Sequence, residues 1–152
     1  MQEKGQVKVN VGIDVLWRAL AKDLKSILPT IVPKLVNEAE ILEGDGGLGT
    51  VYLFKFGPDV PNMSYQKEKI VEFDESLHQI ALQVIEGGRL NLGFTFYKAC
   101  FQLTALGDSE TLVDLKVDFA IECQETRAPP GETVKSGVAF IQALENFLLK
   151  QI

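Results

Sequence analysis

The chain has 152 residues, of which 46% are hydrophobic and 24% are charged, which is enough apolar material for one compact domain with a sizeable core. Its formal net charge is -6 and its lysines and arginines form no cluster, which argues against a nucleic-acid groove and an anionic membrane surface. No apolar run approaches the roughly twenty residues of a membrane span, and residues 1–10 are too polar for a signal peptide. We therefore expect a single domain, residues 1–152, in the cytoplasm.

The cysteines and the histidine predict no reactive site. Cys100 and Cys123 lie among strand-like residues, without a second pair, a CxxC motif or clustered histidines, which is typical of reduced thiols packed in a core. His78 is the only histidine and has no serine or cysteine beside it, so a structural role is expected. The sequence predicts no metal and no cofactor.

The N-terminal part predicts one strand and two short helices. Residues 2–11 open with alternating polar and apolar side chains, the period of a half-buried strand. Asp14 is a candidate N-cap for the first short helix. A second short helix is expected over residues 26–32, interrupted by Pro29 and Pro33. Two short helices in series favour a V-shaped brace.

The most glycine-dense stretch, residues 43–50, suggests a nucleotide-binding loop. Such a loop needs a lysine and a hydroxyl after its last glycine, and then a helix whose N-terminal amides face the phosphate. Here Thr50 leads directly into the strand-like residues 51–56. A connection between two strands, with glycines at positive φ, is therefore the better interpretation.

From residue 37 onward the pattern predicts a meander of strands. Further strands are expected over residues 63–73, 79–84, 90–103 and 113–121, with turns at 57–61, 74–76, 87–88 and 107–108. On the strand 63–73, Gln66 and Glu68 share the phase of Ile70 and should face inward.

Residues 132–152 predict the only long helix, after a break at residues 128–131. Its apolar residues recur at steps of three and four and form one stripe: Val134, Val138, Ile141, Leu144, Phe147 and Leu148. The predicted fold class is α+β, with a seven-stranded antiparallel sheet curled around this helix and two short helices in a V.

The space between sheet and helix is the central functional question. One helix covers the concave face of a large sheet less completely than a second sheet would, so the gap is either a closed core or a cavity. Inward-facing Gln66 and Glu68 favour a cavity, which Tyr65 and Tyr97 are also expected to reach. An apolar lining with a few polar groups suits a small, flat, largely apolar ligand.

Five motifs spread over the chain carry a family resemblance. They are Glu43-Gly-Asp-Gly-Gly-Leu-Gly49-Thr50, Tyr65-Gln66-Lys67-Glu68, Glu72-Phe73-Asp74-Glu75-Ser76, Leu82-Gln83-Val84-Ile85-Glu86-Gly87-Gly88 and Leu144-Glu145-Asn146-Phe147-Leu148-Leu149. Together they resemble the plant pathogenesis-related class 10 proteins of the birch pollen allergen (Bet v 1) fold, most closely the cytokinin-specific, phytohormone-binding proteins of legumes. The resemblance implies a helix-grip, START-like fold and an internal cavity for a plant hormone such as a cytokinin or gibberellin, or for another apolar metabolite.

The resemblance also implies where this chain departs from the hormone binders. The glutamine and glutamate that contact their ligand correspond to Gln66 and Glu68, whereas a threonine and a tyrosine on their terminal helix correspond to Gly137 and Phe140. Each lost hydroxyl removes a hydrogen bond worth about 1 kcal/mol net. The ligand is therefore expected to differ, and Gly137 to let it approach the helix backbone.

A second, enzymatic hypothesis comes from the resemblance to norcoclaurine synthase, which condenses dopamine with an aldehyde. Its glutamate corresponds to Glu68 and, with a one-residue slip, its tyrosine to Tyr65, while its lysine becomes Ile80 and its aspartate Ala99. An isoleucine can neither transfer a proton nor activate a carbonyl. This favours a binding protein, and leaves an enzyme that uses Glu68 as acid or base as the alternative.

The predicted ligand-binding residues are Gln66, Glu68, Tyr65, Ile80, Leu82, Tyr97, Ala99, Gly137, Phe140 and Ile141. No catalytic residue is assigned. The expected partner is a small apolar or amphipathic ligand, a hormone or an alkaloid-like metabolite, and the oligomeric state stays open between a monomer and a weak dimer.

Overall fold

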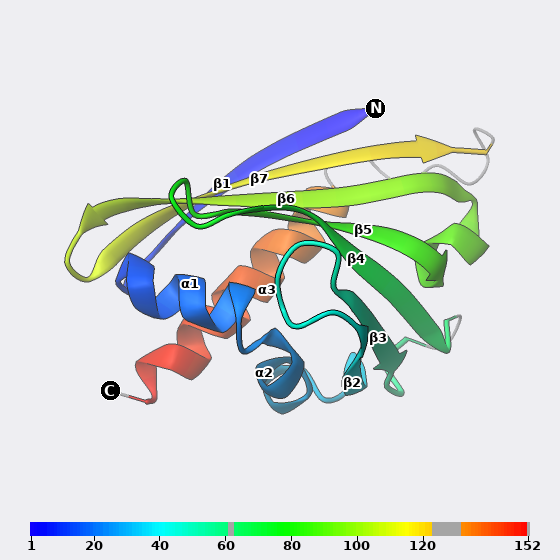
Figure 1. Ribbon diagram of the computed structural model, residues 1–152, viewed down its shortest axis with the longest axis horizontal. Helices are drawn as coiled ribbons and strands as arrows, with labels where there is room; N and C mark the ends of the chain where they lie inside the picture. The colour runs from blue at the N-terminus through cyan, green and yellow to red at the C-terminus, as the bar shows by residue number, and fades with distance from the viewer. Residues whose placement is uncertain (61–62, 123–131, 152) are drawn as a thin grey trace.

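The computed structural model describes residues 1–60, 63–122 and 132–151 (Figure 1). Its strands are β1 (Gln2–Val9), β2 (Val36–Glu43), β3 (Val51–Phe56), β4 (Tyr65–Asp74), β5 (Gln79–Gly87), β6 (Phe94–Gly107) and β7 (Glu110–Ile121). Its helices are α1 (Ile13–Ala21), α2 (Leu24–Ile31) and α3 (Glu132–Leu149), with a 3-10 turn, η1 (Gly88–Leu92).

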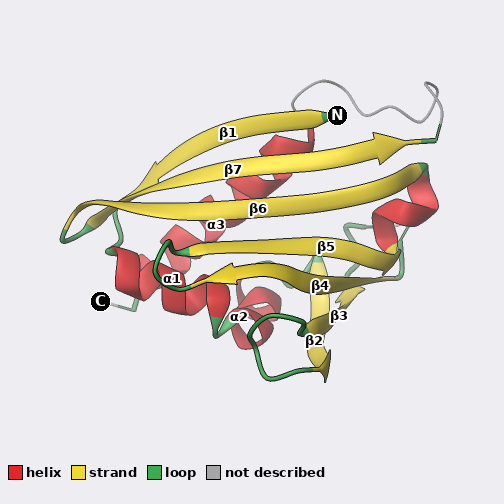
Figure 2. Cartoon of the chain, turned by 45° about the horizontal axis from the view of Figure 1, so that its top comes forward, coloured by secondary structure: helices red, strands yellow, loops and turns green. Residues whose placement is uncertain are grey.

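All seven strands form one antiparallel sheet in the order β1-β7-β6-β5-β4-β3-β2. The sheet curls over α3, and α1 and α2 lie on the same side of it (Figures 1 and 2). This arrangement confirms the predicted fold class. None of the helices in the described ranges is long and apolar enough to cross a membrane.

The glycine-rich stretch connects β2 to β3, as the sequence predicted. Gly44, Gly46 and Gly49 have φ angles of 88°, 106° and 87°, a region that favours glycine because it has no Cβ. The Gly46 amide donates a hydrogen bond of 2.8 Å to Thr50 Oγ1, and the Thr50 side chain is fully buried. The stretch is a strand connection, with no helix after it to face a phosphate.

Several sequence expectations were wrong at their boundaries. The second short helix spans Leu24–Ile31, and Pro29 lies inside it without interrupting it. Helix α1 begins one residue before Asp14, with Gly12 as its N-cap and no capping side chain. The strand expected to begin at Leu90 begins at Phe94, because Gly87, Gly88 and Gly93 all have positive φ and the chain winds into η1 between them. Helix α3 ends at Leu149. The expected break at residues 128–131 and the second cysteine, Cys123, lie outside the described residues.

Helix α3 rests directly on β1 and β7, at two glycines. A Cβ at Gly5 in β1 would lie 2.5 Å from Val134 Cγ1, and one at Gly137 in α3 would overlap Leu115 Cδ2 of β7. Bare backbone at both positions allows this close approach. Because α3 lies against β1 and β7, a space remains between it, helix α2 and the strands from β2 to β6.

Candidate functional site

The candidate site is an interior cavity of about 470 Å³. Most of its walls are apolar. They comprise Leu24 and Leu28 of α2, Val32 and Leu35 after it, Val36, Phe54, Leu82, Ala99 and Phe101 of the sheet, and Gly137, Ala139 and Phe140 of α3, with Ser136 beside them. A cavity of this size and lining is typical of a small-molecule site.

Strand β4 turns two polar side chains into the cavity. Gln66 is buried and Glu68 is half-buried, in the same phase as the fully buried Ile70. Alternate residues of a strand face the same side of the sheet, so the predicted inward direction of Gln66 and Glu68 is confirmed. The two side chains lie at one end of the cavity together with Arg89 and Tyr97, and we call these four residues the polar cluster.

Gln66 joins the polar cluster together. Its Oε1 accepts a hydrogen bond of 3.2 Å from the backbone amide of Arg89, and its side-chain amide donates one to the Glu68 carboxylate. Gly88 makes room for this arrangement, because a Cβ there would overlap Gln66 Oε1. Gly88 has a φ of 51°, so the bend positions both Gln66 and Arg89.

Arg89 and Tyr97 form a stacked pair. The guanidinium carbon of Arg89 lies 4.5 Å from the centre of the Tyr97 ring, within the range of a cation–π interaction. Phe94 packs edge-on against the same ring, with centroids 5.4 Å apart. The contact with Phe94 holds the Tyr97 ring in place. The face of that ring in turn orients the Arg89 guanidinium at the end of the cavity.

Burial alters the titration of the cluster. Removal of Glu68 from water raises the pKa of its carboxyl, and the hydrogen bond from Gln66 and the charge of Arg89 offset this only in part. Burial also raises the pKa of the Tyr97 phenol. Glu68 is thus protonated more readily than a surface glutamate, and a protonated carboxyl can donate a hydrogen bond.

Seven of the ten residues predicted from the sequence line this cavity: Gln66, Glu68, Leu82, Tyr97, Ala99, Gly137 and Phe140. Ile80 and Ile141 are instead fully buried in the packed core. Tyr65 does not reach the interior, because it alternates with Gln66 along β4. Its phenol donates a hydrogen bond of 2.9 Å to Glu86 Oε2 on an exposed part of the sheet.

Gly137 has a different neighbour from the one expected. It lines the cavity, but the position that its Cβ would occupy is filled by Leu115 of β7. The close approach at this glycine is therefore made by the protein's own core, and the prediction that it admits a ligand to the backbone loses its geometric support.

Sequence reasoning missed Arg89 and the contribution of α2. Arg89 was missed because it falls between the bend predicted at residues 87–88 and the strand predicted from residue 90, so no direction was assigned to its side chain. Two adjacent glycines followed by a third at Gly93 were the signal for a tighter turn. The α2 residues follow no strand alternation, and only the packing of the helix reveals that they form a wall.

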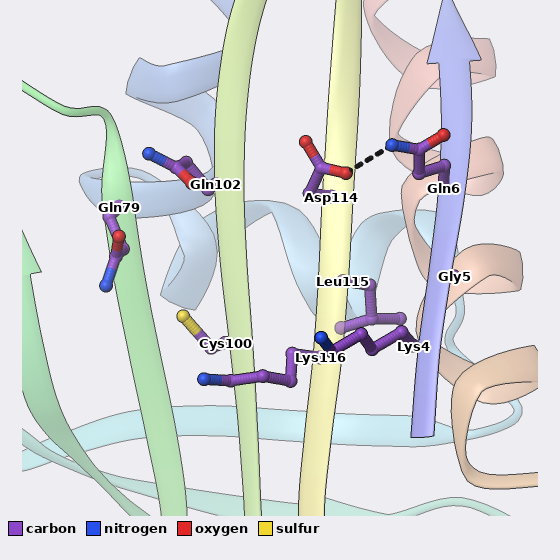
Figure 3. Close-up of a pocket in the computed structure, with 9 residues that line it drawn as sticks. All are labelled: Lys4, Gly5, Gln6, Gln79, Cys100, Gln102, Asp114, Leu115 and Lys116. Carbon is purple, nitrogen blue, oxygen red and sulfur yellow. Dashed lines mark hydrogen bonds between the residues drawn. The ribbon is translucent and has the colours of Figure 1, made fainter. Parts of the chain in front are cut away.

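A second hollow, of about 570 Å³, lies on the outer face of the sheet (Figure 3). We call it the outer groove. It is lined by Lys4, Gly5, Gln6, Gln79, Cys100, Gln102, Asp114, Leu115 and Lys116. Gln6 Nε2 donates a hydrogen bond of 2.6 Å to Asp114 Oδ1 (Figure 3). Cys100 is buried and reduced, and burial raises the pKa of its thiol, which disfavours the reactive thiolate.

Comparisons with known proteins agree with this architecture. The model of the Pathogenesis-related protein Bet v 1 family matches residues 4–151. Norbelladine synthase of Narcissus pseudonarcissus is 26% identical over 118 residues, 77% of this chain and 72% of that protein.

Two solved structures share the fold. Norcoclaurine synthase of Thalictrum flavum, in complex with dopamine and hydroxybenzaldehyde, has a TM-score of 0.77 at 24% identity, over 100% of this chain and 88% of the other. Major latex-like protein 151 of Panax ginseng has a TM-score of 0.81 at 21% identity, over 97% of this chain and 96% of the other.

Proposed function

Since the chain belongs to the Pathogenesis-related protein Bet v 1 family, we propose that it is a cytoplasmic small-molecule binding protein. Its ligand is a plant hormone, such as a cytokinin or gibberellin, or another apolar metabolite held in the interior cavity. The observation that carries this proposal is the cavity of about 470 Å³, apolar on most sides with the polar cluster at one end. Apolar walls supply affinity through surface removed from water, and the few polar groups fix orientation.

The test is calorimetric titration with trans-zeatin, gibberellic acid, abscisic acid and indole-3-acetic acid. Ala99 lines the cavity on β6, so Ala99→Phe should fill part of it and weaken binding about tenfold or more, because a bulky ring excludes the ligand. Ala105 is on the same strand but exposed, and Ala105→Phe should leave affinity unchanged. Absence of binding to all four compounds would refute a hormone as the ligand, and full affinity in a folded Ala99→Phe variant would refute the cavity as the binding site.

A second candidate function, an enzyme of the norcoclaurine synthase type, is favoured by Glu68. Its raised pKa makes Glu68 a better proton donor candidate than a surface glutamate, and norbelladine synthase is among the relatives. Among the described lining residues, however, there is no lysine to engage a carbonyl, which favours binding over condensation.

Incubation with dopamine and 4-hydroxybenzaldehyde, followed by mass spectrometry, tests this alternative. Product that disappears in Glu68→Gln would establish it, because glutamine has no titratable proton. An equal rate in the variant would remove Glu68 from any mechanism.

A further inference from the structure

Arg89 lies at the polar end of the cavity, and no carboxylate of the described residues is close enough to it for an ion pair. Six cations, Lys8, Arg18, Lys22, Lys55, Lys67 and Lys98, have a carboxylate oxygen within 4.0 Å in the described part of the chain. Arg89 is not in this set. It is half-buried in the cavity wall, where water solvates a charge less well than at the surface.

The arrangement around Arg89 leaves its hydrogen-bonding edge available. The guanidinium stacks on the face of Tyr97 at 4.5 Å, and Gln66 bonds the backbone amide of Arg89, not its side chain. A guanidinium carries five N–H donors in its own plane, and stacking through its face leaves that edge open. The stacking also reduces the rotational freedom lost when a ligand binds.

The neighbours of Arg89 do not neutralise it fully. Two acidic groups act on the cluster: Glu68, whose protonated form is favoured by burial, and Glu3, whose charge raises the pKa of Tyr97. A protonated Glu68 contributes a donor to the same end of the cavity, while a charged one would repel an anion. The remaining lining residues of the described chain are uncharged. The cavity therefore combines apolar walls with one oriented cation.

We propose that Arg89 selects ligands that carry a carboxylate on a compact apolar body, with the carboxylate bound to the edge of the guanidinium and the apolar body against the walls formed by α2 and α3. This inference rests on the proposed binding function and narrows it to acidic ligands. A guanidinium binds a carboxylate through two parallel hydrogen bonds in one plane, a geometry that a lysine ammonium cannot match. Amines are disfavoured by the charge of Arg89, and neutral ligands can accept its hydrogen bonds but lack the charge-assisted part of the interaction.

The experiment compares a carboxylic acid with its neutral amide. Indole-3-acetic acid and indole-3-acetamide have the same ring and nearly the same shape, so their affinity ratio reports the carboxylate alone. In the unmodified protein the acid should bind about tenfold more tightly or better, as expected for a charge-assisted pair. Arg89→Gln should abolish this ratio by weakening the acid and not the amide, and Arg89→Lys should retain part of it.

A matched control removes one positive charge elsewhere. Lys67 lies on β4 with its ammonium 3.1 Å from Glu86 Oε2 and does not line the cavity, so Lys67→Gln should leave the ratio unchanged. Equal affinity for acid and amide in the unmodified protein would overturn the inference, as would an equal loss of both in a folded Arg89→Gln.

Binding of the neutral fluorophore N-phenyl-1-naphthylamine distinguishes a failure of ligand binding in the cavity from a failure of acid selection by Arg89. If it binds and Ala99→Phe weakens it, while acid and amide do not differ, the cavity binds ligands but Arg89 does not select them. If neither the fluorophore nor the indoles bind, the binding function and the inference fail together.

Discussion

The interior cavity and the outer groove have similar volumes, about 470 and 570 Å³, yet their linings differ in kind. In the outer groove, polar groups pair across neighbouring strands, as Gln6 does with Asp114 (Figure 3). In the cavity, the polar cluster lies at one end, and the rest of the wall is apolar apart from Ser136. Volume alone therefore does not distinguish them.

The difference in lining predicts how strongly each hollow can bind a charged ligand. Charges in an open groove are solvated and screened, so an ion pair formed there contributes about 0–1 kcal/mol. Charges at the end of an apolar cavity are less solvated, and a ligand that matches them gains more. Three substitutions test this difference, beginning with the largest expected effect.

Gly88→Ala should disrupt the cavity's polar end most. A Cβ at Gly88 would overlap Gln66 Oε1, so Gln66 must move and its hydrogen bonds to Arg89 and Glu68 break. We expect a loss of about 1–3 kcal/mol in the free energy of unfolding, measured by urea denaturation. Affinity for indole-3-acetic acid should fall as well.

Gly46→Ala is the matched control for this change. Gly46 has a φ of 106°, and nothing lies within 4 Å of the added Cβ, so the substitution reports backbone strain without a clash. It should destabilise the fold by about 1–2 kcal/mol and leave affinity unchanged. If Gly88→Ala also leaves affinity unchanged, the position of Gln66 does not matter for binding.

Glu68→Gln should change how stability depends on pH. The pKa of Glu68 is raised in the folded protein, chiefly by burial, so its contribution to stability is fully present below the pKa of the unfolded chain. That contribution is lost as the pH rises through the folded pKa. Relative to the native protein, the variant should therefore gain stability as the pH rises above the ordinary carboxyl range.

Thermal melting of both proteins from pH 4 to pH 8 measures this difference. The two melting curves should be closest at the acid end and diverge toward pH 8, with the variant higher. A constant difference across the range would mean that the Glu68 pKa is not raised. Glu110, which pairs with Lys8 on the surface at 3.6 Å, supplies the control variant Glu110→Gln, which should not reproduce the trend.

The sequence was sufficient for the fold and for part of the walls built from strands, because alternation assigns each strand residue to a face. Gln66 and Glu68 were found in this way, and Tyr65 was misplaced by disregarding the same rule. The sequence also placed Ile80 in the wall, although Ile80 is buried in the packed core, and it did not name Val36, Phe54 or Phe101. Arg89 was missed because η1 depends on three backbone angles that no hydrophobic pattern encodes. Gly137 was misread because only the packed structure shows Leu115 filling its space.

Lys116→Gln in the outer groove should have the smallest effect. Lys116 lies opposite Lys4 on the neighbouring strand β1, which is unfavourable, but its charge also favours the ionised form of Glu72. These two influences oppose each other at a partly exposed position, so the free energy of unfolding should change by less than about 0.5 kcal/mol. Affinity for indole-3-acetic acid should not change. Lys4→Gln, from the facing strand, serves as a paired control with the same expectation. Weaker binding in either variant would mean that the outer groove also contributes to ligand binding. The difference in lining would then not separate a binding hollow from a non-binding one.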